Sequence, residues 1–142
     1  MTPARMAALH AACFRVPPPW RAADFAACLD DPACLVVTAG DAGFALGRVA
    51  GDEAELLTLA VAPGARRRGH GRRLLTVFEG RAAMRGARRA VLEVTACNRA
   101  ARTLYGAAGY SVAGRRPALY RGSDGAPVDA LTLARALAPE TG

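Results

Sequence analysis

Between Ala65 and Leu75 the chain reads ARRRGHGRRLL. An apolar run, Leu56–Val61, precedes these residues, and apolar residues at helical spacing follow them. The pattern therefore predicts a strand, a glycine-rich turn and the start of a helix. Two glycines two residues apart let the backbone turn tightly and leave its N–H groups uncovered by side chains. Because such N–H groups and the positive end of a helix dipole favour phosphate oxygens, we expect a phosphorylated cofactor at this turn.

The composition is that of a globular protein. The chain has 142 residues, of which 52% are hydrophobic and 22% charged, and this size allows one domain with a full core. No apolar run approaches the length that spans a bilayer, and the N-terminal residues lack the pattern of a signal peptide. We therefore expect a single domain, residues 1–142, in the cytoplasm, with no membrane partner.

The basic residues are concentrated in one part of the chain. All nineteen are arginine, a bias that a GC-rich genome explains as well as any functional demand does. From Arg66 to Arg102 there are eleven arginines and only two acidic residues, Glu79 and Glu93, which gives a local charge of +9 within a total of +7. A phosphorylated cofactor explains part of this charge, and an acidic or RNA-bearing partner is one explanation of the rest. Solvated helix faces are the other explanation for the arginines beyond Arg73.

The cysteines do not predict a metal site. Cys13, Cys28, Cys34 and Cys97 include no Cys-x-x-Cys pair, and no histidine lies nearby in a metal-binding pattern, so we expect no metal. Without a secretion signal they are interpreted as free thiols of a reducing compartment. A nucleophilic role for Cys97 is the less favoured alternative.

Hydrophobic spacing and turn residues divide the chain into helices and strands. Helices are predicted at residues 4–14 and 20–29, separated by the prolines at 17–19, then from Gly71 to a stop at Gly86, and from an Asn98 N-cap to Gly109. Strands are predicted at 34–38, 44–50, 53–61, 90–94, 110–115 and 130–133, the last two joined by a loop that holds residues 122–125. This order predicts a mixed α/β sheet.

Four segments resemble one enzyme family. Arg66-x-x-Gly69-x-Gly71 after an apolar strand resembles the acyl-CoA pyrophosphate motif of the GNAT acetyltransferases. LEVTACN, which ends at Asn98, resembles the LEV-x-x-x-N segment of the RimI-like branch, and LYGAAGY, which ends at Tyr110, resembles its LYExxGF helix end. Gly114-Arg115-Arg116, Tyr120, Asp124-Gly125 and Asp129-Ala130 resemble the C-terminal pattern of that branch. The likeness is close over residues 53–133 and loose over residues 20–50.

The resemblance implies the GNAT fold: a mixed, mostly antiparallel central sheet with helices on both faces. Members of the family usually begin with a strand, whereas this chain starts at a helix, so either the first strand is absent or the true start lies upstream. The chain also departs from the RimI-like branch near the C-terminus. Pro117-Ala118-Leu119 precedes a lone Tyr120 where the branch carries adjacent tyrosines, and Val128 precedes Asp129 where the branch carries Glu-Asp. In the family these positions lie near the acceptor.

The resemblance further implies transfer of an acetyl group from acetyl-CoA to an amine by direct attack. The amine must lose a proton first, and Glu93, the one charge in an apolar strand, is the candidate base. Partial burial would raise its pKa and make it a better base. Tyr105 is the candidate acid that protonates the leaving thiolate. The alternatives are a Glu93 that is exposed or paired with an arginine, and a Tyr105 that only packs in the core.

The residues implied to bind acetyl-CoA come from three segments. The strand at residues 53–61 offers main-chain groups, the turn offers N–H groups and cations, and the helix capped by Asn98 contributes an amide and a phenol. These residues are Leu59, Ala60, Val61, Arg66, Arg67, Arg68, Gly69, His70, Gly71, Arg72, Asn98 and Tyr105. A plain N-cap is an equally good interpretation of Asn98, and His70 is interpreted as incidental between the glycines. Glu53 and Glu55 are rival bases, ranked below Glu93.

By resemblance the acceptor is the N-terminal α-amine of a protein or peptide, with an alanine-terminal ribosomal protein as the first hypothesis. A small-molecule amine is the alternative within the family, and a non-catalytic CoA- or RNA-binding module is the alternative from another class. Aromatic residues near the arginines are few, Phe78 and Tyr105, and single-strand binding would need more. We therefore expect no direct contact with nucleic acid; the oligomeric state stays open.

Overall fold

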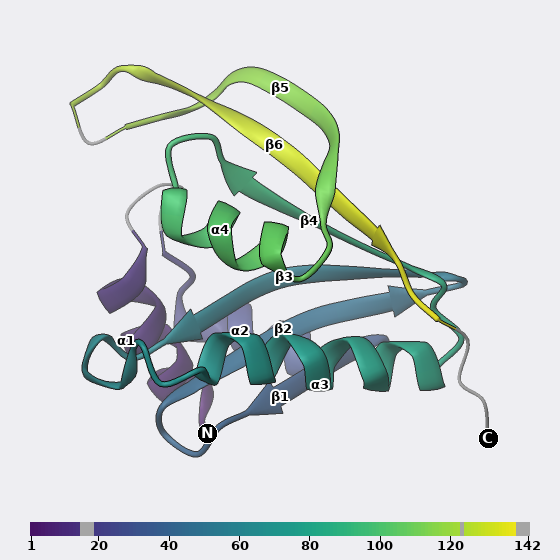
Figure 1. Ribbon diagram of the computed structural model, residues 1–142. Coiled ribbons are helices and arrows are strands. Elements are labelled where there is room, and N and C mark those ends of the chain that lie inside the picture. The colour runs from purple at the N-terminus through teal and green to yellow at the C-terminus, as the bar shows by residue number, and fades with distance from the viewer. Residues whose placement is uncertain (15–18, 123, 139–142) are drawn as a thin grey trace.

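One curved sheet runs through the molecule, with its strands in the order β1-β2-β3-β4-β6-β5 (Figure 1). The computed structural model describes residues 1–14, 19–122 and 124–138, so Pro17, Pro18 and Ser123 lie outside the described residues. The strands are β1 (Cys34–Thr38), β2 (Gly43–Ala50), β3 (Glu53–Val61), β4 (Arg89–Thr95), β5 (Ser111–Arg121) and β6 (Pro127–Ala136). Neighbouring strands pair antiparallel except β3 and β4, which are parallel. The mixed α/β fold with helices on both faces is therefore confirmed.

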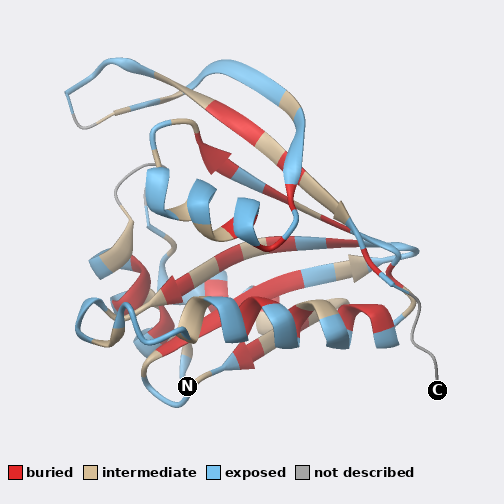
Figure 2. Cartoon of the chain, viewed as in Figure 1, coloured by how far each residue is buried: buried red, intermediate tan, exposed pale blue. Residues whose placement is uncertain are grey.

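Helices cover both faces of the sheet, and each face has its own core (Figures 1 and 2). The helices α1 (Pro3–Cys13) and α2 (Ala22–Leu29) pack on β2 and β3 around the buried Phe25 and Phe44. On the other face, α3 (His70–Met84) and α4 (Arg99–Ala107) pack on β1–β4 and β6 around Phe78. A short 3-10 helix, η1 (Pro63–Ala65), joins β3 to the turn before α3.

β3 contains an extra residue relative to β2, and its pairing with β4 stops near this point. Leu46 pairs with Thr58 but the next residue, Gly47, pairs with Leu56, so Leu57 is an extra residue in β3. Such a bulge bends the strand that carries it and increases its twist. The parallel pairing with β4 ends at Leu56–Leu92, and the two strands part beyond that point. Backbone groups of residues 57–61 on this edge of β3 are thus left without a β4 partner.

Gly47 lets α3 approach β2 closely at this bulge. A Cβ atom at this position would collide with the Phe78 ring and with the backbone carbonyl of Glu55. The Phe78 side chain is completely buried. The absence of a side chain at Gly47 therefore sets how near α3 packs to the sheet.

The predicted boundaries agree best where the signal is local. The strands at 34–38 and 53–61 match β1 and β3, and Asn98 is the N-cap of α4, with its Oδ1 accepting from the Ala101 N–H at 3.0 Å. The predicted strands 110–115 and 130–133 are too short. β5 and β6 extend further because Asp129 holds an irregular stretch of β5 against β6 by contacts between residues distant in sequence. The first element in the described residues is α1, which begins at Pro3.

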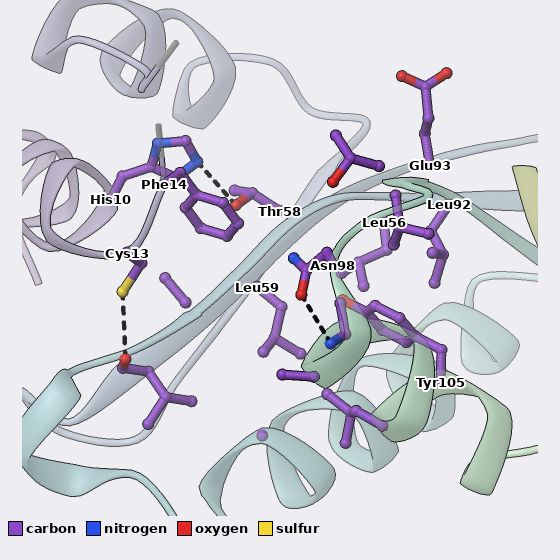
Figure 3. Close-up of a pocket in the computed structure, with 18 of the residues that line it drawn as sticks. His10, Cys13, Phe14, Leu56, Thr58, Leu59, Leu92, Glu93, Asn98 and Tyr105 are labelled. Carbon is purple, nitrogen blue, oxygen red and sulfur yellow. Dashed lines mark hydrogen bonds between the residues drawn. The ribbon is translucent and has the colours of Figure 1, made fainter. Parts of the chain in front are cut away.

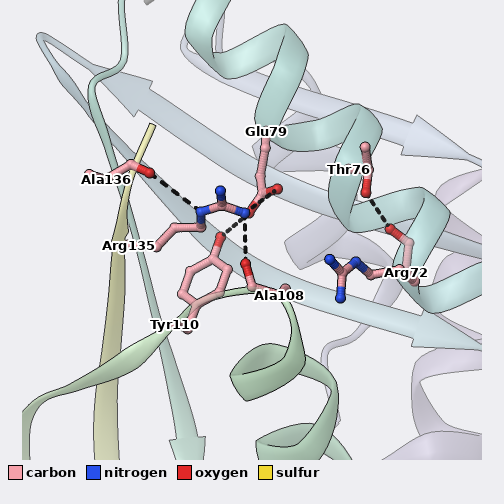
Figure 4. Close-up of polar contacts among 7 residues, drawn as sticks. All are labelled: Arg72, Thr76, Glu79, Ala108, Tyr110, Arg135 and Ala136. Carbon is pink, nitrogen blue, oxygen red and sulfur yellow. Dashed lines mark hydrogen bonds and ion pairs between the residues drawn. The ribbon is translucent and has the colours of Figure 1, made fainter. Parts of the chain in front are cut away.

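A polar network ties α3, α4 and the β5–β6 hairpin together (Figure 4). Tyr110 donates its hydroxyl to Glu79 of α3 at 2.7 Å, and Arg135 of β6 pairs with the same carboxylate at 3.3 Å. Arg135 also donates to the Ala108 carbonyl at the end of α4, at 2.7 Å. Burial, followed by the hydrogen bond to Glu79, raises the pKa of Tyr110. These contacts fix the C-terminal end of α4, and the Tyr110 ring contacts the Tyr105 ring edge-on at a centroid distance of 5.7 Å.

Among the described helices, none combines the length and the apolar character that crossing a membrane requires.

Candidate active site

The gap between β3 and β4 is a cleft of about 360 Å³ (Figure 3). Its walls are the separated strand ends, residues 56–61 and 92–95, with α1 on one side and α4 on the other. The strand ends present main-chain groups, since the parallel pairing stops at Leu56. The predicted donor residues Leu59, Ala60 and Val61 all line this cleft. An extended chain that entered here could add to the free edge of β3.

The arginine-glycine turn closes one end of the cleft. Gly69 is the N-cap of α3 and has a left-handed backbone, φ 78°, and Arg67 has φ 65°. Left-handed residues of this kind occur in turns whose backbone N–H groups bind anions. Gly71 and Arg66 line the cleft, and Arg66 Nε donates to the Val61 carbonyl at 3.3 Å. The tight turn before α3 is therefore present, and phosphate binding there stays a prediction.

The other side chains of the turn are exposed. Arg67, Arg68 and Arg72 make no side-chain hydrogen bond or ion pair with any described residue. His70 is half-buried at the start of α3, and Arg73 contacts its Nδ1 at 3.0 Å. Three unpaired cations beside a helix N-terminus favour a polyanionic group such as a diphosphate.

Tyr105 reaches the cleft from α4. Its ring is buried in the core with Leu92 and Val94, and burial raises the pKa of the Tyr105 hydroxyl. The hydroxyl makes no hydrogen bond to a described residue, and Tyr105 lines the cleft. A phenol in this environment stays protonated and has a proton to donate. Core packing of the ring and access to the cleft, which are compatible, occur together.

Glu93 lies on the opposite face of β4 (Figure 3). Side chains alternate along a strand, so Leu92 points toward the core with Tyr105 while Glu93 points to the side of the sheet on which α1 lies. The Tyr120 hydroxyl donates to Glu93 Oε1 at 2.6 Å, and Arg116 Nη1 lies 4.0 Å from Oε2. The Glu93 side chain is 34% exposed, so it is partly buried. It lines the cleft.

A histidine that sequence reasoning left aside also lines the cleft. His10 of α1 is buried, and its Nδ1 accepts the backbone N–H of Trp20 at 3.0 Å. The proton is therefore on Nε2, which donates to Thr58 Oγ1 of β3 at 3.1 Å. Burial lowers the pKa of His10 to about 4, so the ring is neutral near pH 7. No local pattern could have predicted this, because the partner on β3 is 48 residues away.

The remaining candidates are distributed around the cleft or away from it. Asn98 lines the cleft and is the N-cap of α4, so its Oδ1 is engaged while its amide N–H groups make no bond within the described chain. Glu53 pairs with Arg89 at 3.2 Å in the paired half of β3, and neither Glu53 nor Glu55 lines the cleft. Cys97 is exposed. Within the described ranges, no three His, Cys, Asp or Glu side chains group as metal ligands would.

Residues 4–110 match the acetyltransferase (GNAT) family model. The chain belongs to the GNAT acetyltransferase family. It is an N-acetyltransferase, and its family uses acetyl-CoA as the donor. The open edge of β3, the left-handed Gly69 and the unpaired arginines fit that donor, whose diphosphate is anionic and whose pantetheine arm carries amides.

Two solved structures resemble this chain at 31% sequence identity. One is the ribosomal-protein-S18-alanine N-acetyltransferase from Escherichia coli, with a TM-score of 0.84 over 97% of this chain and 88% of that chain. The other is nourseothricin acetyltransferase, with a TM-score of 0.66 over 76% of this chain and 68% of that chain.

A third structure shows the fold alone, at 16% identity and a TM-score of 0.78. It is an aminoglycoside 6'-N-acetyltransferase complexed with coenzyme A, matched over 99% of this chain and 93% of that chain. No curated protein sequence matches this chain.

Proposed function

We propose that this N-acetyltransferase acetylates the N-terminal α-amine of a protein, and that an alanine-terminal ribosomal protein is the first acceptor to test. The Escherichia coli enzyme named for that reaction supports this choice, since it matches nearly the whole chain at 31% identity. The observation that carries the proposal is the placement of Glu93 and Tyr105, which reach one cleft from opposite faces of the sheet. We further propose that the reaction takes place in the cytoplasm, where new protein N-termini are made.

The donor is bound by main-chain groups and by the turn. When bound, acetyl-CoA supplies the acetyl thioester. The edge of β3 at Leu59, Ala60 and Val61, which lines the cleft, would pair with the pantetheine amides, and Asn98 would add a side-chain N–H. The N–H groups at Gly69, His70 and Gly71 would hold the diphosphate, and Arg66, Arg67, Arg68 and Arg72 would neutralise it.

Glu93 is the base. An α-ammonium group has a pKa of about 7.7–8.0, so most of it is protonated at neutral pH and the amine must be freed before it attacks. A carboxylate in contact with the acceptor accepts that proton, either directly or through a water molecule. Glu93 Oε2 is the oxygen for this task, because Oε1 already accepts the Tyr120 hydroxyl.

Tyr105 is the acid. The leaving sulfur gains negative charge as the thioester bond breaks, and a proton donor stabilises it. The Tyr105 hydroxyl has a proton and no hydrogen-bond partner within the described chain, so it is available to the sulfur. Tyr110 and the network around Arg135 hold α4, and therefore Tyr105, in place.

A small amine is the second candidate acceptor, and the likeness to nourseothricin acetyltransferase favours it. One experiment separates the two. The chain is incubated with acetyl-CoA and one acceptor in each of three parallel reactions. The acceptors are peptides that begin with alanine, peptides of the same sequence blocked at the α-amine, and nourseothricin. The products are measured by mass spectrometry. The proposal predicts acetylation of the free α-amine only. Acetylation of nourseothricin without acetylation of the peptides would contradict the proposal and support the small-amine function.

A further inference from the structure

The β5–β6 hairpin contains an irregular stretch next to the cleft. Arg116 pairs with Ala130 and the next pair is Tyr120 with Val128, so residues 117–119 of β5 lie opposite the single residue Asp129. Ala118 in the middle of this bulge has φ 54°, a conformation that non-glycine residues adopt only when other contacts hold it.

Asp129 provides those contacts. Its Oδ1 accepts the backbone N–H of Ala118 at 2.8 Å, and its Oδ2 accepts Nε of Arg115 at 2.8 Å and also Nη2 of the same guanidinium. The N–H of Ala118, followed by the Arg115 guanidinium, lowers the pKa of Asp129. The carboxylate is therefore charged and fixes the bulge from the opposite strand.

The bulge determines where Tyr120 lies. Three residues of β5 lie opposite one residue of β6, so β5 has two extra residues here and pairs with β6 again at Tyr120, opposite Val128. The Tyr120 hydroxyl then lies 2.6 Å from Glu93 Oε1, although the two residues are 27 positions apart. Arg116, on the near side of the bulge, lies 4.0 Å from Oε2. The base of the proposed reaction is thus contacted by a side chain on either side of the bulge.

We propose that Tyr120, placed by the Asp129-held bulge, is a positioning residue that orients Glu93 for proton transfer. The inference rests on the proposed role of Glu93 as the base. Tyr120 occupies Oε1 and keeps its own proton, so Oε2 is the oxygen that accepts the proton of the acceptor ammonium.

The first test is a double-mutant cycle with Tyr120→Phe and Glu93→Gln. We expect Tyr120→Phe to lower kcat about tenfold, as loss of a hydrogen bond to a charged group does, with less than about a twofold change in the KM for acetyl-CoA. In the Glu93→Gln background it should cause no further loss, because its effect passes through the carboxylate. Val112→Ala, at the far end of β5, is the matched control and should keep wild-type kinetics.

The second test does not depend on turnover. The hydrogen bond to Glu93, followed by burial, raises the pKa of Tyr120 to about 12. Absorbance titration of tyrosinate should therefore show one tyrosine that ionises near pH 10 in Glu93→Gln, close to the ordinary tyrosine value, and none there in the wild-type chain. Asp129→Ala should show the same new ionisation, because it releases the bulge.

The outcomes separate the two proposals. A wild-type chain that acetylates no α-amine contradicts the proposed function, whatever the titration shows. If the wild-type chain is active, two results overturn the positioning role alone. In one, Tyr120→Phe keeps full kcat. In the other, Tyr120→Phe lowers kcat by the same factor in the Glu93→Gln background as in the wild-type chain. A titration that Glu93→Gln leaves unchanged would show that the contact is absent in solution, and this also overturns it.

Discussion

The backbone N–H of Trp20 donates to Nδ1 of His10 at 3.0 Å and so fixes which nitrogen of the buried ring carries the proton. Nε2 then donates to Thr58 at 3.1 Å, at the point where β3 has just passed its bulge. Phe14 stacks on the ring at a centroid distance of 4.4 Å. This neutral histidine joins α1 and the segment before α2 to the wall of the cleft, so protonation of the ring affects both stability and the site.

The pH dependence of stability follows from this histidine. Burial lowers the pKa of His10 to about 4 in the folded chain, whereas an unfolded histidine has a pKa of about 6.5. The unfolded chain therefore binds a proton first, and the free energy of unfolding falls as the pH drops from about 6.5 to about 4, by on the order of 2–3 kcal/mol. Urea unfolding at several pH values measures this. His10→Gln should flatten the dependence in that window, and the control His70→Gln should leave it intact.

Gly69 at the N-cap of α3 should be needed for donor binding. Its φ of 78° strains any residue with a Cβ, at a cost of about 1–2 kcal/mol. Gly69→Ala should therefore weaken acetyl-CoA binding about tenfold in isothermal titration calorimetry. Gly64→Ala, in the same turn region but without positive φ or a close neighbour, is the control. Equal affinities of the two variants would contradict an anion site at the turn.

Glu93→Gln and Tyr105→Phe should each lower kcat by about 10²-fold or more, since each removes one proton-transfer group. Acetyl-CoA affinity should change little, because neither change alters the edge of β3 or the turn. Steady-state kinetics with an alanine-terminal peptide, together with calorimetric donor binding, make the comparison. Turnover within about twofold of wild type in either variant would remove that residue from the proposed chemistry.

The network of Figure 4 should contribute more stability than an exposed ion pair of the same residue types. Glu79 and Arg135 have side chains that are 12% and 34% exposed, and Tyr110 shares the carboxylate. Glu79→Ala leaves the Tyr110 hydroxyl without its acceptor and Arg135 without its ion-pair partner, and should cost about 1–3 kcal/mol. Glu53→Ala breaks the ion pair with Arg89. Because these two side chains are 48% and 51% exposed, the change should cost less than about 1 kcal/mol. Chemical denaturation measures the free energy of unfolding of both variants. Equal losses would show that the network contributes no more stability than an exposed ion pair.

The sequence predicted the site unevenly, for a physical reason. The turn from Arg66 to Gly71 was predicted because its glycines and the apolar runs on both sides are local signals. The contacts of Glu93 were not predicted, because strand alternation gives two faces but does not say which residues lie over each face. Tyr120 was noted as part of the family's C-terminal pattern and as a departure from its adjacent tyrosines, but not as a partner of Glu93, since that contact depends on a bulge in β5.

The sequence by itself determined the order of helices and strands, the N-cap at Asn98, the glycine-rich turn before α3 and the family, because each of these depends on residues within a few positions of one another. Only the tertiary structure decided that β3 and β4 part beyond Leu56, that His10 is neutral on Thr58, and that Tyr120 meets Glu93. Those contacts join residues 48 and 27 positions apart. They form only after the strands have paired and the helices have packed, so no local pattern of residues encodes them.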